Sequence, residues 1–198
     1  MNTLSLTPGD VVLIRHGETA WSLSGQHTGS TDIPLTDNGE RNAKKLAPML
    51  AKWPINHVLS SPLRRAQRTC DLAGLGPQKV IDPDLLEWNY GDYEGLTTAE
   101  IRLQSPGWLV FRDGCPGGET PQQVAERVDR VISRARKQGG IVALFAHGHV
   151  LRVLAARWIG LAPSQGAHFL LDTCTLSILS EYRGVPALKC WNAPLTET

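Results

Sequence analysis

Two apolar runs that each end in a polar, glycine-bearing turn dominate the pattern of hydrophobic and polar positions along the chain. Residues 11–14 are Val-Val-Leu-Ile and lead into Arg15-His16-Gly17. Residues 141–146 are Ile-Val-Ala-Leu-Phe-Ala and lead into His147-Gly148-His149. Short continuous apolar runs bounded by turn residues are typical of parallel strands that are buried on both faces. The pattern therefore predicts two interior strands, each followed directly by a histidine.

Helical signals fill much of the sequence around these runs. The predicted helices cover residues 37–52, 62–72, 121–138 and 150–159. A short further helix is expected after Thr97, which opens a capping-box pattern. Thr36 is expected to cap the first helix, and Pro48 is expected to kink it or end it early. Ser61 is expected to cap the second helix, with Pro62 at its first position.

The remaining stretches complete an α/β pattern. Short strands are predicted at residues 57–60, 168–172, 175–181 and 187–191, and loops at residues 17–35 and 81–95. Alternating strands and helices predict a three-layer sandwich, with a mostly parallel central sheet and helices on both of its faces. Nothing repeats and no low-complexity linker divides the chain, so the sequence indicates a single domain over residues 1–198.

Composition narrows the class of protein. The chain has 198 residues, 41% of them hydrophobic, which is enough for a substantial core. A net charge of +1 gives no overall field for nucleic acid or a membrane surface. The four cysteines form no CxxC pair, so reduced thiols are expected. Residues 1–10 lack the pattern of a signal peptide and no apolar run is long enough to span a bilayer, so we expect a cytoplasmic protein.

The first candidate for chemistry is the Arg15-His16 pair. Ligands of open α/β sheets bind at the carboxyl ends of the strands, where this pair is expected to lie. A neutral imidazole can attack phosphorus and form a covalent intermediate, and Arg15 would hold phosphate oxygens in a bidentate fork. The alternative is a structural histidine, held by backbone hydrogen bonds, beside a surface arginine.

A second candidate lies at residues 60–66, Ser-Ser-Pro-Leu-Arg-Arg-Ala. A helix that starts at a strand end offers free N–H groups to an anion. Taken alone, the segment is better explained as a capped helix with two solvated arginines. Arg15 nearby changes that balance, because a phosphate dianion needs several positive donors.

The other strand-end turn offers His147 and His149. A metal pair is disfavoured because no HExxH motif or comparable third ligand is present, so no metal site is expected. His147 is better suited to donate a hydrogen bond to a transferring phosphoryl group. In that role we expect His147 to be protonated, whereas His16 must be neutral to attack.

Residues 87–95 bring three carboxylates together with aromatic residues and glycines. Glu87 lies between Leu86 and Trp88, so we expect it to be partly desolvated and able to act as a general acid. A phosphate monoester needs such a group, because an alkoxide leaves poorly unless it is protonated. The alternative is a solvated acidic loop, which suits Asp92 and Glu94.

Together these motifs resemble the histidine phosphatase superfamily, which includes phosphoglycerate mutases and acid phosphatases. The matching segments are, in order, Arg15-His16-Gly17-Glu18-Thr19, Thr28-Gly29, Pro34-Leu35-Thr36, Ser61-Pro62-Leu63-x-Arg65-Ala66, Glu87 with Tyr90-Gly91-x-x-x-Gly95, Gly118-Glu119 and His147-Gly148. Each motif is weak alone, but their shared order covers nearly the whole chain.

The resemblance implies a phosphoglycerate mutase-like fold, no metal and no cofactor. It implies that His16 is the nucleophile that becomes phosphorylated and that Glu87 is the proton donor. Arg15, Arg65 and His147 would line the phosphate pocket. The substrate would be a small phosphorylated metabolite. Family members often form dimers. The sequence leaves open whether this chain forms a homodimer, although no apolar stripe marks an interface.

Within the family, hydrolysis is expected rather than mutase activity. Mutases carry a longer insertion with a lysine and an arginine pair, whereas residues 96–118 contain only Arg102 and Arg112 and no lysine. Ser22 also follows Trp21 where mutases usually have asparagine. A cofactor-dependent phosphoglycerate mutase is the alternative, and an inactive phosphate-binding scaffold is the second alternative.

Within the family, the chain looks most similar to a narrower subgroup of broad-specificity acid phosphatases and sedoheptulose-bisphosphatase-like enzymes. His149 is the residue that distinguishes this subgroup. The expected substrate-binding residues are Ser22, Thr28, Gly29, Gly148 and His149. The family arginine directly precedes alanine, so Arg65 is expected in the pocket and Arg64 in solvent. The sequence leaves two interpretations open for Trp108 and Phe111: they form a wall of the pocket, or they pack in the core.

Overall fold

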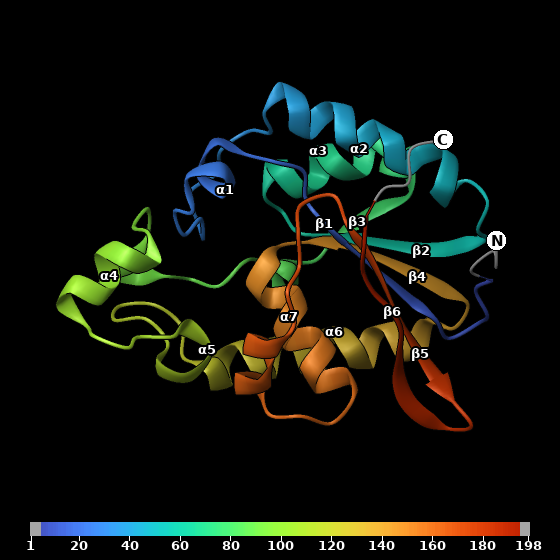
Figure 1. Ribbon diagram of the computed structural model, residues 1–198. Helices are drawn as coiled ribbons and strands as arrows, with labels where there is room; N and C mark the ends of the chain where they lie inside the picture. The colour runs from blue at the N-terminus through green and yellow to red at the C-terminus, as the bar shows by residue number, and fades with distance from the viewer. Residues whose placement is uncertain (1–4, 195–198) are drawn as a thin grey trace.

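A single six-stranded sheet forms the centre of the computed structural model, which describes residues 5–194 (Figure 1). The strands are β1 (Val11–Arg15), β2 (Ile55–Ser60), β3 (Lys79–Ile81), β4 (Ile141–Ala146), β5 (Leu176–Tyr182) and β6 (Val185–Ala193). Residues 1–4 and 195–198 lie outside the described residues. They are the two ends of the predicted single domain, and residues 1–4 also begin the segment that lacks a signal-peptide pattern.

The strand order is β3-β2-β4-β1-β5-β6. Strands β3, β2, β4 and β1 pair in parallel, whereas β5 runs antiparallel to β1 and β6 antiparallel to β5. The two runs that dominate the sequence pattern are therefore the two central neighbours of the parallel part. The predicted α/β sandwich with a mostly parallel sheet is confirmed.

Helices cover both faces of the sheet. They are α1 (Ala20–Ser24), α2 (Asp37–Leu50), α3 (Arg64–Leu72), α4 (Thr98–Gln104), α5 (Val110–Asp113), α6 (Pro121–Gln138) and α7 (Gly148–Trp158). Short 3-10 helices lie at Gly76–Gln78, Pro83–Leu85, Gly91–Tyr93 and Pro163–His168. Helices α2 and α3 lie on one face and α6 and α7 on the other (Figure 1). In residues 5–194 no helix combines the length and apolar character needed to cross a membrane.

Strand β1 shows why the apolar runs are continuous. Val11 and Leu13 belong to the core cluster that includes α6 and α7 side chains. Val12 and Ile14 belong to the cluster on the opposite face, together with Leu46 of α2. Successive side chains of a strand point to opposite faces, so a strand covered on both sides must be apolar at every position.

Two local predictions are wrong. Ser61 does not cap the second helix, which begins at Arg64 after Leu63 in the N-cap position without a side-chain cap. Residues 168–172 do not form a strand: the Leu170 and Leu171 carbonyls accept side-chain hydrogen bonds from Trp191 and Arg15 instead of entering a ladder.

Other differences are smaller. Pro48 lies inside α2, which ends two residues later at Leu50, in agreement with the expected early stop. The predicted loop at residues 17–35 contains the short helix α1, whose N-cap Thr19 forms a capping box with Ser22. A five-residue helix is too short for sequence periodicity to reveal.

Candidate active site

The two strand-end histidines lie side by side because β1 and β4 are paired in register. Arg15 is opposite Ala146, and the backbone N–H of His16 donates to the carbonyl of Ala146 at 3.0 Å. The rings of His16 and His147 have their centroids 5.1 Å apart. The expected approach of the two imidazoles to one another is confirmed.

His16 is held as a neutral imidazole with one free ring nitrogen. Its Nδ1 lies 2.7 Å from the carbonyl oxygen of Gly17, an acceptor, so Nδ1 must carry the hydrogen. Burial and the charges of Arg65 and Arg15 hold the pKa of His16 well below its ordinary value. The Nε2 nitrogen therefore keeps its lone pair, as a nucleophile requires.

His147 is also neutral, so the expectation that it is protonated is wrong for this structure. Its Nδ1 accepts from Nε of Arg65 at 3.1 Å, which leaves no room for a hydrogen on that nitrogen. Its Nε2 then carries the hydrogen and lies 2.7 Å from Oγ of Ser61. Burial, with Arg65 and His16 adding to it, holds the pKa of His147 well below its ordinary value.

Arg65 is completely buried behind the two histidines, whereas Arg64 is exposed as expected. The guanidinium of Arg65 donates to the carbonyl oxygens of Thr28, Gly29 and Thr31 at 2.9, 3.0 and 2.9 Å. Thr28 and Gly29 thus contact Arg65 through their backbones. These bonds tie the loop over the site to a fixed positive charge.

Arg15 presents an unused donor. Its Nη1 donates to the carbonyl of Leu171, but its Nε is the one buried side-chain nitrogen or oxygen without a partner in the described part of the chain. A Cβ at Gly148 would lie 3.2 Å from Cζ of Arg15, so glycine lets the start of α7 approach the guanidinium closely. A buried N–H without a partner is costly, and an acceptor from a ligand would relieve that cost.

Glu87 is held by the first turn of α7 and by its own loop. Its Oε1 accepts from the N–H groups of Trp88 and Val150, and its Oε2 from the N–H of His149, all at 2.9 Å. The side chain is buried, with 8% of it exposed, as its apolar neighbours predict. The free N–H groups at a helix start favour an anionic group in this position.

Arg127 of α6 fixes the backbone that carries Glu87. Its guanidinium forms a bidentate ion pair with Glu119, at 2.8 and 3.0 Å. It also donates to the carbonyl oxygens of Asp84, Leu86 and Glu87, at 2.9, 2.6 and 3.1 Å. Glu119 in turn accepts from the backbone N–H of Asn89 at 2.8 Å. This pair, in which Arg127 is buried and Glu119 half-buried, therefore holds the loop on both sides of Glu87.

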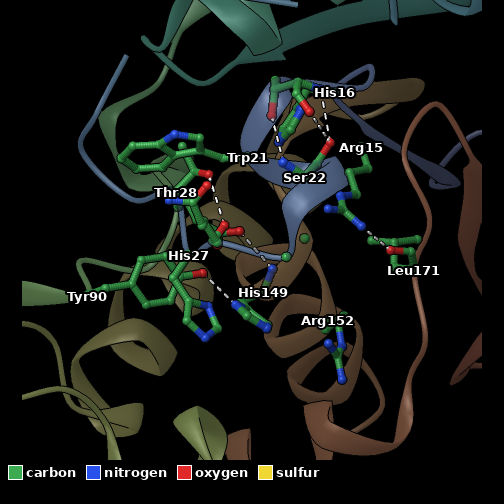
Figure 2. Close-up of a pocket in the computed structure, with 15 residues that line it drawn as sticks. Arg15, His16, Trp21, Ser22, His27, Thr28, Tyr90, His149, Arg152 and Leu171 are labelled. Carbon is green, nitrogen blue, oxygen red and sulfur yellow. Dashed lines mark hydrogen bonds between the residues drawn. The ribbon is translucent and has the colours of Figure 1, made fainter. Parts of the chain in front are cut away.

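A cavity of about 220 Å³ opens in front of these groups (Figure 2). Its lining residues are Arg15, His16, Thr19, Trp21, Ser22, Gly25, Gln26, His27, Thr28, Glu87, Tyr90, Gly148, His149, Arg152 and Leu171. The predicted residues Ser22, Thr28, Gly148 and His149 are among them. Gly29, Arg65 and His147 are not, because they lie behind the cavity wall.

An aromatic cluster forms one wall of the cavity. The hydroxyl of Tyr90 lies 2.5 Å from Nδ1 of His149, and the His27 ring packs on both (Figure 2). Burial lowers the pKa of His27 to about 4 and that of His149 well below its usual value. Trp108 and Phe111 pack edge-on against His27 and His149 from outside, so they support the wall and do not line the cavity.

Sequence reasoning missed Arg152, Tyr90 and Arg127 as parts of the site. Tyr90 was visible only as part of the family motif, and its burial could not be read from a segment of alternating polar and aromatic residues. Arg152 and Arg127 lie on amphipathic helices, where an arginine is usually solvated. In residues 5–194 no group of three or more His, Cys, Asp or Glu side chains has an arrangement that could hold a metal ion.

Comparisons with known proteins agree with this geometry. The model of the histidine phosphatase superfamily (branch 1) matches residues 11–194. An acid phosphatase of Mycobacterium tuberculosis is 40% identical over 182 residues, which cover 90% of this chain and 89% of that protein. A sedoheptulose 1,7-bisphosphatase of Saccharomyces cerevisiae is 41% identical over 194 residues, which cover 79% of this chain and 69% of that protein.

The fold is shared as well. The solved structure of the open reading frame Rv3214 of Mycobacterium tuberculosis matches with a TM-score of 0.90 and 38% identity, over 94% of this chain and 98% of that chain. The resemblance that the motifs indicate is thereby confirmed over nearly the whole length. The chain belongs to the histidine phosphatase superfamily.

Proposed function

We propose that this protein is a phosphatase that hydrolyses small phosphate monoesters through a phosphohistidine on His16. Nε2 of His16 attacks phosphorus, and the P–N bond forms as the P–O bond to the leaving group breaks. Glu87, which takes up a proton as the negatively charged substrate binds beside it, gives that proton to the leaving oxygen. Water then attacks the phosphohistidine, Glu87 takes a proton from it, and inorganic phosphate leaves.

The tautomer of His16 carries this proposal. A histidine that donates its Nδ1–H to the backbone presents an unprotonated Nε2 to the cavity, which is what in-line attack on phosphorus needs. Arg15 beside it has an unpartnered Nε–H for a phosphoryl oxygen. A positive donor that is fixed before the reaction stabilises negative charge as it develops on the equatorial oxygens.

Arg65 and His147 have supporting roles in this proposal. Arg65 keeps the Nδ1 side of His147 occupied, so the Nε2–H of His147 is directed toward Ser61 and the region of His16. In this proposal that N–H leaves Ser61 and becomes a neutral donor to the phosphoryl group, beside the charged donor of Arg15. Gly148, Ser22, Thr28 and His149 would contact the rest of the substrate from the cavity wall.

The mutase alternative is disfavoured by the positions of Arg102 and Arg112. Arg102 donates to the backbone oxygen of Trp108, and Arg112 pairs with the neighbouring Asp113. Neither arginine lines the cavity. A second anionic group of a bisphosphorylated intermediate would find no partner in this segment, so hydrolysis should be faster than phosphoryl return.

His16→Ala tests the proposal, with p-nitrophenyl phosphate as the substrate. Phosphate release should fall by roughly a thousandfold or more, the scale of losing a nucleophile. His168→Ala is the matched control, because His168 is exposed and does not line the cavity. Brief incubation with labelled substrate should trap a phosphoprotein that is stable to base and labile to acid, as a phosphohistidine is.

Two results would contradict the proposal. Phosphate release that persists in His16→Ala would exclude His16 as the nucleophile, and an acid-stable label would indicate serine instead. Interconversion of 2- and 3-phosphoglycerate with a bisphosphoglycerate primer, faster than hydrolysis, would favour the mutase.

A further inference from the structure

Glu94 is half-buried in the loop of residues 87–95, where one interpretation of the sequence is a solvated acidic side chain. Its carboxylate instead has backbone partners. Oε1 accepts from the N–H groups of Gly29 and Thr31 at 2.9 and 3.0 Å. Oε2 also accepts from the N–H of Gly29, at 3.1 Å. Glu94 therefore holds the same loop that is bonded to Arg65.

A single peptide group connects Glu94 to Arg65. The carbonyl of Thr28 accepts from Nη2 of Arg65 at 2.9 Å, and the N–H of the same peptide, that of Gly29, donates to Glu94. A peptide that accepts from a cation and donates to an anion is polarised in one direction by both, which strengthens both bonds. Glycine at position 29 allows the approach, because a Cβ there would lie 2.6 Å from Oε2 of Glu94. Glu94 is thus an anion one peptide away from Arg65.

Arg65 needs such an anion because it is a fully buried charge without a direct ion pair. Within residues 5–194 its guanidinium forms no salt bridge. A buried cation is costly unless opposite charge lies close by. Burial lowers the pKa of Arg65. Three nearby carboxylates oppose that effect, those of Glu87, Asp32 and Glu94. Of the three, Glu94 accepts from a peptide whose carbonyl binds Arg65.

The position of Arg65 decides which nitrogen of His147 carries the hydrogen. Nε of Arg65 donates to Nδ1 of His147 at 3.1 Å, so the hydrogen lies on Nε2. An arginine that shifts away frees Nδ1, and the tautomer with the hydrogen on Nδ1 then becomes accessible. In that tautomer His147 has no Nε2–H to donate to a phosphoryl oxygen.

We propose that Glu94 is a positioning residue for phosphoryl transfer: through the Thr28–Gly29 peptide it holds Arg65 in place and thereby keeps the hydrogen of His147 on Nε2. The inference rests on the proposed function, in which that Nε2–H binds the phosphoryl group. Glu94 does not line the cavity, so it acts without contacting the substrate.

Glu94→Gln tests the proposal because it removes the charge and keeps the shape. An amide oxygen in the place of Oε1 can still accept from Gly29 and Thr31, so the loop keeps these hydrogen bonds. On p-nitrophenyl phosphate, kcat should fall roughly tenfold, as for one weakened hydrogen bond to the transition state, and KM should change less than about twofold. Asp92→Asn is the matched control, because it makes the same change at an exposed carboxylate of the same loop and should alter neither constant.

Nuclear magnetic resonance locates the hydrogen of His147 without turnover. The 15N chemical shifts of labelled histidine separate a ring nitrogen that carries hydrogen from one with a free lone pair. In the wild-type protein Nε2 should carry the hydrogen, and in Glu94→Gln the shifts of the two nitrogens should approach each other as the second tautomer is populated. The amide proton of Gly29 should lie far downfield in the wild-type protein, as the donor of a charge-assisted bond, which tests the peptide link without any variant.

Several results would overturn the proposal. A rise in KM without a fall in kcat would mean that Glu94 only shapes the cavity wall. Unchanged His147 shifts in Glu94→Gln would overturn it, as would a change confined to His27, on which the Glu94 charge also acts. So would a Gly29 amide proton without the downfield shift. Activity that persists in His16→Ala refutes the phosphohistidine mechanism and leaves these spectra unaffected, whereas activity that needs His16 but not the Glu94 charge refutes the role of Glu94 alone.

Discussion

At the scale of single residues, the two histidines of the site differ in where their hydrogen lies and not in their charge. The backbone takes the Nδ1–H of His16, and Arg65 occupies Nδ1 of His147. Nε2 of His16 is consequently an electron-pair donor, and Nε2 of His147 is a hydrogen-bond donor. Arginine achieves this asymmetry without a protonated imidazole, because it can only donate.

Gly29→Ala tests how tightly the loop over Arg65 is fixed. A Cβ at this position would lie 2.6 Å from Oε2 of Glu94 and 2.6 Å from the carbonyl of Trp88. The loop must move away, and Arg65 would lose carbonyl acceptors while remaining buried. We expect the free energy of unfolding to fall by about 2–3 kcal/mol, measured by urea denaturation, and kcat to fall with it.

Ser30→Ala is the control for this change, because Ser30 is the adjacent residue and is exposed. An unchanged denaturation midpoint in Gly29→Ala would show that the loop yields without cost. The contact with Arg65 would then be incidental to the stability of the site.

Three of the residues that sequence reasoning identified lie at the end of a strand or directly after it. His16, His147 and Arg15 are of this kind, since buried strands are visible as apolar runs. The hydrogen-bond partners of Arg127 lie 8 to 43 residues away in the sequence, and those of Arg152 lie 14 and 15 residues away. A local pattern cannot show that a long polar side chain on a helix will be buried by such distant segments.

At the scale of secondary-structure elements, Glu87 depends on two helices. The start of α7 supplies two of its N–H donors, and Arg127 of α6 holds the backbone on which it lies. Neither helix contains Glu87. The position of the proposed proton donor is therefore set by how α6 and α7 pack against its loop.

Arg127→Lys should impair proton donation more than the other steps. Lysine keeps the charge beside Glu119 but loses the planar fork, so the Glu87 loop should shift. We expect kcat on glycerol 3-phosphate, whose alkoxide needs a proton to leave, to fall about tenfold more than kcat on p-nitrophenyl phosphate. Steady-state rates on the two substrates measure the difference.

Arg130→Lys is a matched control, since Arg130 lies three residues further along α6 and pairs with Asp84 at the surface. Arg130→Lys should not lower the rate on one of the two substrates more than the rate on the other. Equal losses on both substrates in Arg127→Lys would mean that Arg127 contributes stability and does not position the proton donor.

The elements themselves were predictable to different degrees. Long helices and buried strands were identified because their periodicity extends over many residues. The strand predicted at residues 168–172 was wrong because its carbonyls bind the side chains of Trp191 and Arg15, which no pattern within the segment indicates. Ser61 resembles an N-cap, but the tertiary fold uses its hydroxyl for His147.

At the scale of the whole molecule, the site makes the fold sensitive to acid. His16, His27, His147 and His149 are buried, and burial lowers the pKa of each below the ordinary value of 6.5. Below pH 6.5 the unfolded chain binds protons at these positions, whereas the folded protein does not. Stability is therefore full above pH 6.5 and is lost as the pH falls toward about 4, the pKa of His27.

Urea denaturation between pH 7 and 4.5 should show this loss. Each histidine contributes a slope of up to about 1.4 kcal/mol per pH unit in that window. His27→Gln should make the slope shallower by up to one such increment, whatever it does to the stability at pH 7. A flat profile from pH 7 to 5 would show that these side chains are not held neutral in the folded protein.

The pairing of β1 with β4 also bears on how such an enzyme can diversify. The proposed reacting groups lie at matched positions of two interior strands, where a one-residue insertion would turn every following side chain to the opposite face. The residues that surround the remainder of the substrate are carried by α7, α1 and surface loops, which tolerate replacement far better. Directed evolution of substrate range should therefore succeed through libraries at the cavity rim, while the strand ends stay untouched.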